Sequence, residues 1–168
     1  MNNKWQIIVF STPSGTLGKA NSILYGTEEC RVPDLQGAFS TKFRGHNLIL
    51  TSSGDKLLNC GGSTTKECHY LDINQMKWVY HSTLTNDRYI SKSVTMPNGA
   101  YIFGGSAGAA TTLTSDFLPK NSNVWQTGPP IPDGFKSGCT VQLSQTELLL
   151  IGGRNVGESA NCLLYFLK

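Results

Sequence analysis

Three pairs of adjacent glycines recur along the chain at similar spacing. They are Gly61-Gly62, Gly104-Gly105 and Gly152-Gly153, and the first glycines of successive pairs lie 43 and 48 residues apart. Each pair follows a hydrophobic tetrad, "LLNC", "AYIF" or "LLLI", which itself follows a turn signal and another apolar segment. Each pair therefore predicts the end of the second strand of a β-hairpin, and the chain is expected to consist of repeated units.

A tryptophan follows two of these hairpins at a matching distance. Leu71 stands seven residues before Trp78, and Leu118 stands seven residues before Trp125. In the last unit "CLLYFL" (162–167) takes the corresponding place, without a later Trp. A period of roughly 40 to 50 residues with four strands per unit is typical of a β-propeller blade. The paired glycines are expected to let neighbouring backbone pass close, and the tryptophans to pack between adjacent units.

The repeat divides an all-β chain into four units of one incomplete domain. They are a degenerate partial unit over 1–35, complete units over 36–83 and 84–127, and a partial unit over 128–168. In the first unit "QIIVF" (6–10) is expected to be the second strand.

The glycine pair, the following leucine and the spaced Trp resemble the kelch repeat, most clearly over 44–153. The chain departs from that pattern where Leu71 and Leu118 replace the usual Tyr. The segments "EECRVPDL", "LLNCGG", "KECHYLD" and "NDRYISKS" also resemble cysteine-containing propellers related to the central domain of galactose oxidase, which occur in secreted animal proteins. The resemblance implies a kelch-type β-propeller fragment of about three to four four-stranded blades.

Such a partial ring leaves two open edges with unpaired backbone groups. Three outcomes are open: further blades belong to a longer chain, copies of the chain associate to close the ring, or the ring is unusually small. A fragment of a longer chain is the favoured expectation.

Composition excludes several other classes of protein. The net charge is only +3, and the sequence contains no block of like charges. Both features argue against a nucleic-acid partner. The chain contains no run of about 18 apolar residues, so no membrane-spanning helix is predicted. The apolar segment "WQIIVF" is shorter than the core of a signal peptide and is expected to be a strand.

Five cysteines raise the question of disulfides: Cys30, Cys60, Cys68, Cys139 and Cys162. Cys60 ends one predicted strand and Cys68 begins the next, so they can form a bridge, and Cys30 could compete for either. The alternative is that the cysteines are small buried residues. A disulfide would indicate an oxidising compartment, which favours an extracellular location over a cytoplasmic one. The spacing does not match a zinc site, and no metal site is predicted.

Basic residues precede the predicted first strands. Arg44 lies 17 residues before Gly61, while Arg88 and Lys136 each lie 16 residues before the first glycine of their own pair. They are expected to project from one face of the propeller, and Tyr89 and Phe135 are adjacent to two of them. One interpretation is a basic rim that binds an acidic side chain or an anionic sugar. The alternative is that each basic residue bonds to loop carbonyls or to an acidic neighbour.

The chain shows no recognisable catalytic set, and no cofactor is predicted. His46, His69 and His81 are scattered, and "TPSGTLGK" (12–19) does not match a phosphate-binding loop. We expect a non-catalytic module that binds a protein or an anionic glycan through loops on one face. One alternative is a carbohydrate-acting enzyme, including a copper oxidase whose ligands no motif places here. Another is an adaptor of a ubiquitin ligase, a class that usually carries upstream BTB and BACK domains.

Overall fold

The computed structural model describes residues 6–11, 19–24, 30–31, 45–62, 65–72, 74–75, 77–108, 110–131, 134–153 and 162–166. These residues form strands, turns and irregular connections, and no helix occurs among them. The all-β prediction is therefore confirmed. The same residues contain no helix that is long and apolar enough to cross a membrane.

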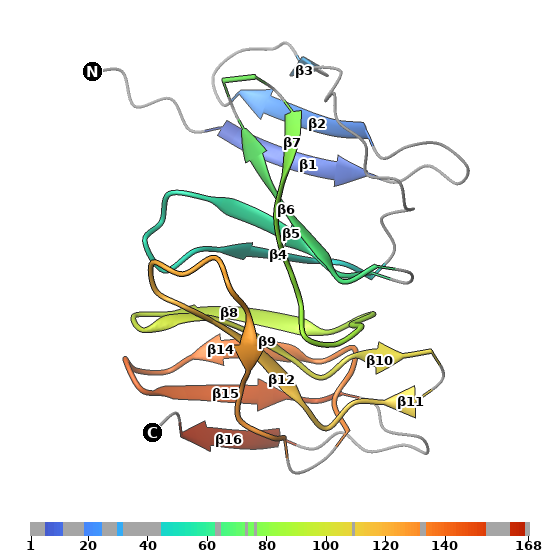
Figure 1. Ribbon diagram of the computed structural model, residues 1–168, viewed down its shortest axis with the longest axis vertical. Helices are drawn as coiled ribbons and strands as arrows, with labels where there is room; N and C mark the ends of the chain where they lie inside the picture. The colour runs from blue at the N-terminus through green and yellow to red at the C-terminus, as the bar shows by residue number, and fades with distance from the viewer. Residues whose placement is uncertain are drawn as a thin grey trace.

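All strand pairs are antiparallel, and the strands follow the chain order closely (Figure 1). The first sheet contains β1 (Gln6–Ser11), β2 (Lys19–Leu24) and β3 (Cys30–Arg31). The second sheet contains β4 (Asn47–Leu50), β5 (Leu57–Cys60), β6 (Glu67–Asp72) and β7 (Lys77–Thr83). The third sheet contains β8 (Lys92–Met96), β9 (Gly99–Phe103), β12 (Ser115–Pro119) and β13 (Gln126–Thr127), and a small hairpin of β10 (Ser106–Ala107) and β11 (Ala110–Thr111) leaves it between β9 and β12. The fourth sheet contains β14 (Cys139–Gln142), β15 (Glu147–Ile151) and β16 (Cys162–Phe166).

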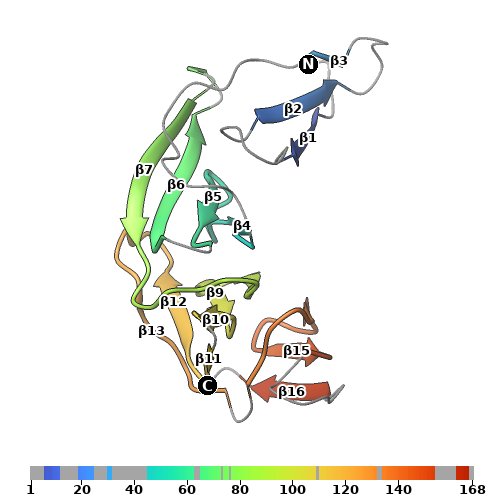
Figure 2. The same cartoon turned by 90° about the vertical axis from the view of Figure 1, so that its right-hand side faces the viewer.

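Two apolar cores lie between successive sheets. The core between the second and third sheets includes Ile49, Leu58, Ile102 and Trp125. The core between the third and fourth sheets consists of Met96, Tyr101, Phe103, Ile131, Phe135, Leu148 and Leu150. Every residue of β9 is buried, because that strand contributes side chains to both cores. The sheets therefore pack face to face, and Figure 2 shows β7 and β13 on the outer side of this arrangement.

The first strands of neighbouring sheets lie side by side, β4 against β8 and β8 against β14. Their hydroxyl side chains bond to the backbone of the preceding sheet. Ser93 Oγ donates to the Leu48 carbonyl at 3.0 Å, and Thr95 Oγ1 donates to the Leu50 carbonyl at 2.5 Å. Thr140 Oγ1 donates in turn to the Ser93 carbonyl at 2.7 Å. These three hydroxyl-to-carbonyl bonds fix the spacing of the sheets at their first strands.

The glycine pairs lie where β5, β9 and β15 end, and all six glycines have positive φ. A Cβ built on Gly104 would stand 1.9 Å from the Phe135 carbonyl oxygen, which leaves no room for a side chain. The next residue, Gly105, donates its N–H to the same oxygen at 2.6 Å. Here a glycine is required because the backbone of the following connection passes directly over it.

Trp78 and Trp125 occupy matching places. Trp78 is paired with Leu71 across β6 and β7 and is buried. Trp125 precedes β13 and is part of the core between the second and third sheets. Its Nε1 donates to Ser82 Oγ of β7 at 3.0 Å, so this side chain also links two sheets.

One disulfide is present among the described side chains, between Cys60 and Cys68. The two residues face each other across β5 and β6 and belong to the core between the second and third sheets. The expected disulfide is therefore confirmed, and its pairing, which the sequence left open, is Cys60 with Cys68. Cys139 has a free, exposed thiol, whereas the side chains of Cys30 and Cys162 lie outside the described part.

Candidate interaction surface at the glycine-pair end

The loops that connect one sheet to the next meet at the end of the strands marked by the glycine pairs, here called the glycine-pair end. Ile90 donates its N–H to the Gly45 carbonyl at 2.8 Å, and Ser137 donates to the Ile90 carbonyl at 3.2 Å. All three residues have left-handed backbone, with φ of 69°, 59° and 61° in chain order. Gly45, Ile90 and Ser137 are therefore equivalent positions in successive units.

This register changes how the sequence repeat must be aligned. The residues directly before these positions are Arg44, Tyr89 and Lys136. Arg88 is equivalent to Phe135 instead, because its carbonyl accepts the N–H of Gly62 just as the Phe135 carbonyl accepts that of Gly105. The three basic residues are thus not at equivalent positions.

The predicted alignment of the basic residues was out of register because the hairpins differ in the length of their turns. Residues 51–56 join β4 to β5, whereas residues 97–98 alone join β8 to β9, and residues 143–146 join β14 to β15. Counting back a fixed number of residues from each glycine pair therefore reaches different positions. The hydrogen-bonded register of the loops gives the correct correspondence.

Arg88 is 0% exposed and every described contact of its guanidinium is internal. Nε donates to Asp116 Oδ2 at 2.5 Å. Nη1 donates to the carbonyls of Gly104 at 2.7 Å and Thr114 at 2.8 Å, and Nη2 donates to the Thr114 hydroxyl at 3.1 Å. For Arg88 the structure shows the alternative raised above, bonding to loop carbonyls and an acidic neighbour, so this side chain offers a partner no surface.

Asp116 also secures the connection between the second and third sheets. Its Oδ1 accepts the backbone N–H of Thr85 at 3.2 Å and the hydroxyl of the same residue. The carboxylate and the guanidinium are both fully buried, and each compensates the charge of the other. Together they hold residues 84–91 against β12.

Phe135 replaces Arg88 in the following connection and is 1% exposed. Its ring packs in the core between the third and fourth sheets and close to Gly138 and Gly153, where a Cβ would meet it at 2.5 and 2.8 Å. Phe135 is therefore a core residue. Its predicted contribution of aromatic contact to a partner does not fit this position.

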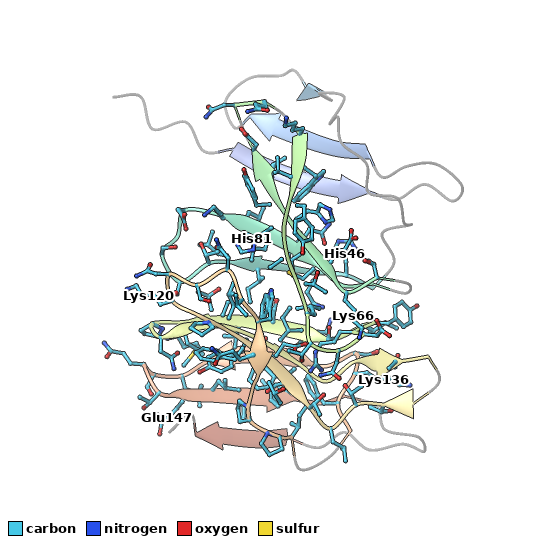
Figure 3. The ribbon with its side chains drawn as sticks, viewed as in Figure 1. His46, Lys66, His81, Lys120, Lys136 and Glu147 are labelled. Carbon is cyan, nitrogen blue, oxygen red and sulfur yellow. A yellow bond between two sulfur atoms is a disulfide. The ribbon has the colours of Figure 1, made fainter. Side chains whose placement is uncertain are left out.

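Tyr89 and Lys136 are the predicted binding residues that keep exposed surface, and both are half-buried. The Tyr89 ring lies directly over Gly45, since a Cβ on that glycine would stand 2.3 Å from the ring. The Tyr89 backbone is fixed by paired hydrogen bonds with Ser106 of β10 at 3.1 and 2.9 Å. Figure 3 shows Lys136 and Lys66 at the same end of the sheets, with Lys120 and Glu147 at the opposite end.

The remaining predicted residue, Arg44, lies outside the described residues. Sequence reasoning also missed Asp116 as the partner of Arg88. An Asp directly before the apolar residues Phe117 and Leu118 of a predicted strand was the available signal, because a buried carboxylate requires a cationic or hydrogen-bonding partner. Among the described residues, no group of three His, Cys, Asp or Glu side chains could hold a metal ion.

No protein-family model and no curated protein matches the chain. The kelch resemblance therefore rests on residues of the chain itself, namely the glycine pairs, the Leu-to-Trp spacing and the cysteine-containing segments.

Proposed function

We propose that the sheets are blades of a kelch-type β-propeller, and that the chain is a non-catalytic module that binds an acidic protein partner at the glycine-pair end. Support for the propeller comes from antiparallel sheets that follow the chain order and pack face to face through apolar cores. Further support comes from first strands that lie side by side. Loops presented by such a rigid stack are a common place for binding sites.

The observation that carries the binding proposal is the hydrogen-bonded register of the connecting loops. Because Gly45, Ile90 and Ser137 are linked in series, the residues that precede the last two, Tyr89 and Lys136, occupy equivalent places on neighbouring sheets. An aromatic ring and an ammonium group are then presented at these equivalent places on neighbouring sheets. Arg44, which lies outside the described residues, precedes Gly45 in the sequence as Lys136 precedes Ser137.

The attraction proposed for a negatively charged partner is local to the lysines, because exposed Glu67 and Asp87 also lie at this end. Lys136 is half-buried and Lys66 is exposed at the same end, whereas Arg88 is neutralised by Asp116 and adds no accessible charge. Tyrosine supplies contact area at low entropic cost, and a neighbouring cation gives attraction at longer range. The disulfide supports an oxidising, extracellular setting for this interaction.

An array of Asp- and Glu-rich peptides, each printed beside its Asn and Gln counterpart, tests the proposal. Acidic peptides are expected to bind the whole chain, and their neutral counterparts are not. For a peptide that binds, Tyr89→Ala should weaken binding about tenfold. Lys136→Ala should weaken it less and reduce its dependence on salt.

Lys120→Ala is the matched control, because it removes one exposed positive charge at the opposite end of the sheets. It should leave peptide binding unchanged. The proposal is overturned if Lys120→Ala weakens binding as much as Lys136→Ala does, or if neither Tyr89→Ala nor Lys136→Ala has an effect. Binding of anionic glycans without any acidic peptide would also overturn it in favour of a glycan-binding module.

A further inference from the structure

A polar cleft lies at the end of the second and third sheets that is opposite to the glycine-pair end. It has a volume of about 320 Å³ and opens between the turn that joins β4 to β5 and the turn that joins β12 to β13. These two turns lie next to each other on the left of Figure 1. The volume falls within the range of small-molecule sites.

The wall formed by the β4–β5 turn is a connected set of polar groups. Asp55 Oδ1 accepts the Thr51 hydroxyl at 2.8 Å and also the Ser53 hydroxyl. Lys56 Nζ lies 3.2 Å from Asp55 Oδ2. Hydrogen bonds from Ser53, Thr51 and Lys56 lower the pKa of Asp55, so its carboxylate is ionised at neutral pH and its charge is matched by the neighbouring ammonium.

The opposite wall consists mainly of amide and hydroxyl groups. Asn121, Ser122 and Asn123 come from the β12–β13 turn, and Leu118 and Pro119 precede them. His81 of β7 lies between the two walls. Its Nδ1 is 2.7 Å from Ser82 Oγ, and its side chain is hydrogen-bonded to Asn123.

We propose that this cleft binds a neutral saccharide. Each hydroxyl of a sugar both donates and accepts hydrogen bonds, and the lining offers carboxylate, hydroxyl and amide oxygens beside hydroxyl and amide donors. Pro119, which is half-buried, provides an apolar surface for the C–H face of a sugar ring. The Asp55–Lys56 pair has no net charge, so an anionic ligand gains no net electrostatic attraction here.

The cleft is separate from the surface proposed for the acidic partner. Most of its residues come from the β4–β5 and β12–β13 turns, whereas Lys136 lies at the glycine-pair end. The proposed saccharide binding therefore does not depend on the proposed partner binding. A module with both sites would recognise a protein at one end and a neutral glycan at the other.

The test is a titration of the whole, isotopically labelled chain with methyl glycosides of glucose, galactose, mannose and N-acetylglucosamine, followed by two-dimensional NMR. At least one glycoside is expected to produce saturable shifts of the backbone amides of residues 51–56 and 121–124. Asp55→Ala and Asn123→Ala should each raise its Kd about tenfold or more, because each removes hydrogen bonds to the sugar. An unchanged amide spectrum away from the cleft shows that each variant is folded.

Lys136→Ala is the control at the opposite end and should leave the Kd unchanged. The proposal is overturned if no glycoside shifts the cleft amides. It is also overturned if Asp55→Ala and Asn123→Ala bind as well as the unmodified chain. Shifts produced only by an anionic sugar, such as a sialic acid glycoside, would refute the assignment to neutral saccharides.

Discussion

The second and third sheets have the same strand order but are secured in different ways. In the second sheet, Cys60 and Cys68 form a disulfide across β5 and β6. The equivalent pair in the third sheet is Phe103 and Ser115, which cannot be cross-linked. The third sheet instead has the buried Arg88–Asp116 pair, and the position of Asp116 corresponds to His69 in the second sheet.

The difference shows that the same backbone pattern accommodates different pairs of side chains at the same two positions. Arg88 corresponds to Phe135 in the next connecting loop. Asp116 corresponds to Leu163 in the strand register of the fourth sheet. A charged pair in one unit is therefore matched by two apolar residues in the next. What is shared is the hydrogen-bonded backbone and the glycine pair.

The largest expected effect is the loss of one charge from the buried pair. Asp116→Leu leaves the Arg88 guanidinium buried without its counter-charge, and should destabilise the chain by about 3 to 5 kcal/mol. The double variant Arg88→Phe, Asp116→Leu copies the fourth sheet and should be more stable than Asp116→Leu alone. Urea unfolding followed by tryptophan fluorescence measures both variants.

The bonds of Arg88 to the Gly104 and Thr114 carbonyls are lost in the double variant, so full recovery is not expected. If Asp116→Leu alone were as stable as the unmodified chain, the ion pair would not secure the third sheet. If the double variant were less stable than the single one, the units would not be interchangeable at this position.

A smaller effect is expected from removing the disulfide. The two cysteines are 8 residues apart in the chain. Closing so short a loop restricts the unfolded state modestly, and Cys60→Ala with Cys68→Ala should cost about 2 to 3 kcal/mol. Thermal unfolding with and without a reductant measures the difference: the reductant should lower the Tm of the unmodified chain and leave that of the double variant unchanged. Cys139→Ser, which removes an exposed thiol, should behave as the unmodified chain does.

The smallest expected effect is a dependence of stability on pH that is confined to the second sheet. All three histidines of the chain belong to the second sheet or to the residue just before it, and burial lowers the pKa of His46, His69 and His81. Because the unfolded chain binds protons more readily, stability is full above the unfolded pKa of about 6.5 and falls as the pH drops below it toward the folded pKa. Glu67, which lies 3.5 Å from His69, opposes this loss but does not reverse it.

Hydrogen exchange from about pH 7.5 to about pH 5 measures the effect, once the intrinsic exchange rates are corrected for pH. Protection of amides in β6 and β7 should decrease before that of amides in β9 and β12. His69→Gln should reduce the difference between the two sheets. Equal loss of protection in both sheets would show that the histidines do not set the response to acid.

Much of the fold could be predicted because the repeat combines local signals that agree. Hydrophobic tetrads, turn residues and glycine pairs indicated the hairpins. The adjacency of two predicted strands made a bridge between Cys60 and Cys68 possible, but it did not exclude Cys30 as a partner of either residue. The alignment of the basic residues was wrong because hairpin turns differ in length, which a count from the glycine pairs does not reveal. Arg88 was placed on a surface because its partner, Asp116, is 28 residues away in sequence.

The cleft was not predicted for a related reason. Asp55, His81 and Asn123 come from three separate strands or turns, and none of them belongs to a recognisable motif. Only the stacking of the second sheet against the third brings them together. Sites formed between repeats are less visible in a sequence than the repeats themselves.

The hydroxyl-to-carbonyl bonds between β4, β8 and β14 have a consequence for engineering the chain. A donor hydroxyl of Ser93, Thr95 or Thr140 reaches only a backbone acceptor, so the identity of the opposing side chain is irrelevant to the bond. Sheets taken from different positions could therefore be exchanged or duplicated, provided that each inserted sheet keeps Ser or Thr at these sites. New loops could then be grafted onto either end without redesigning how neighbouring sheets join.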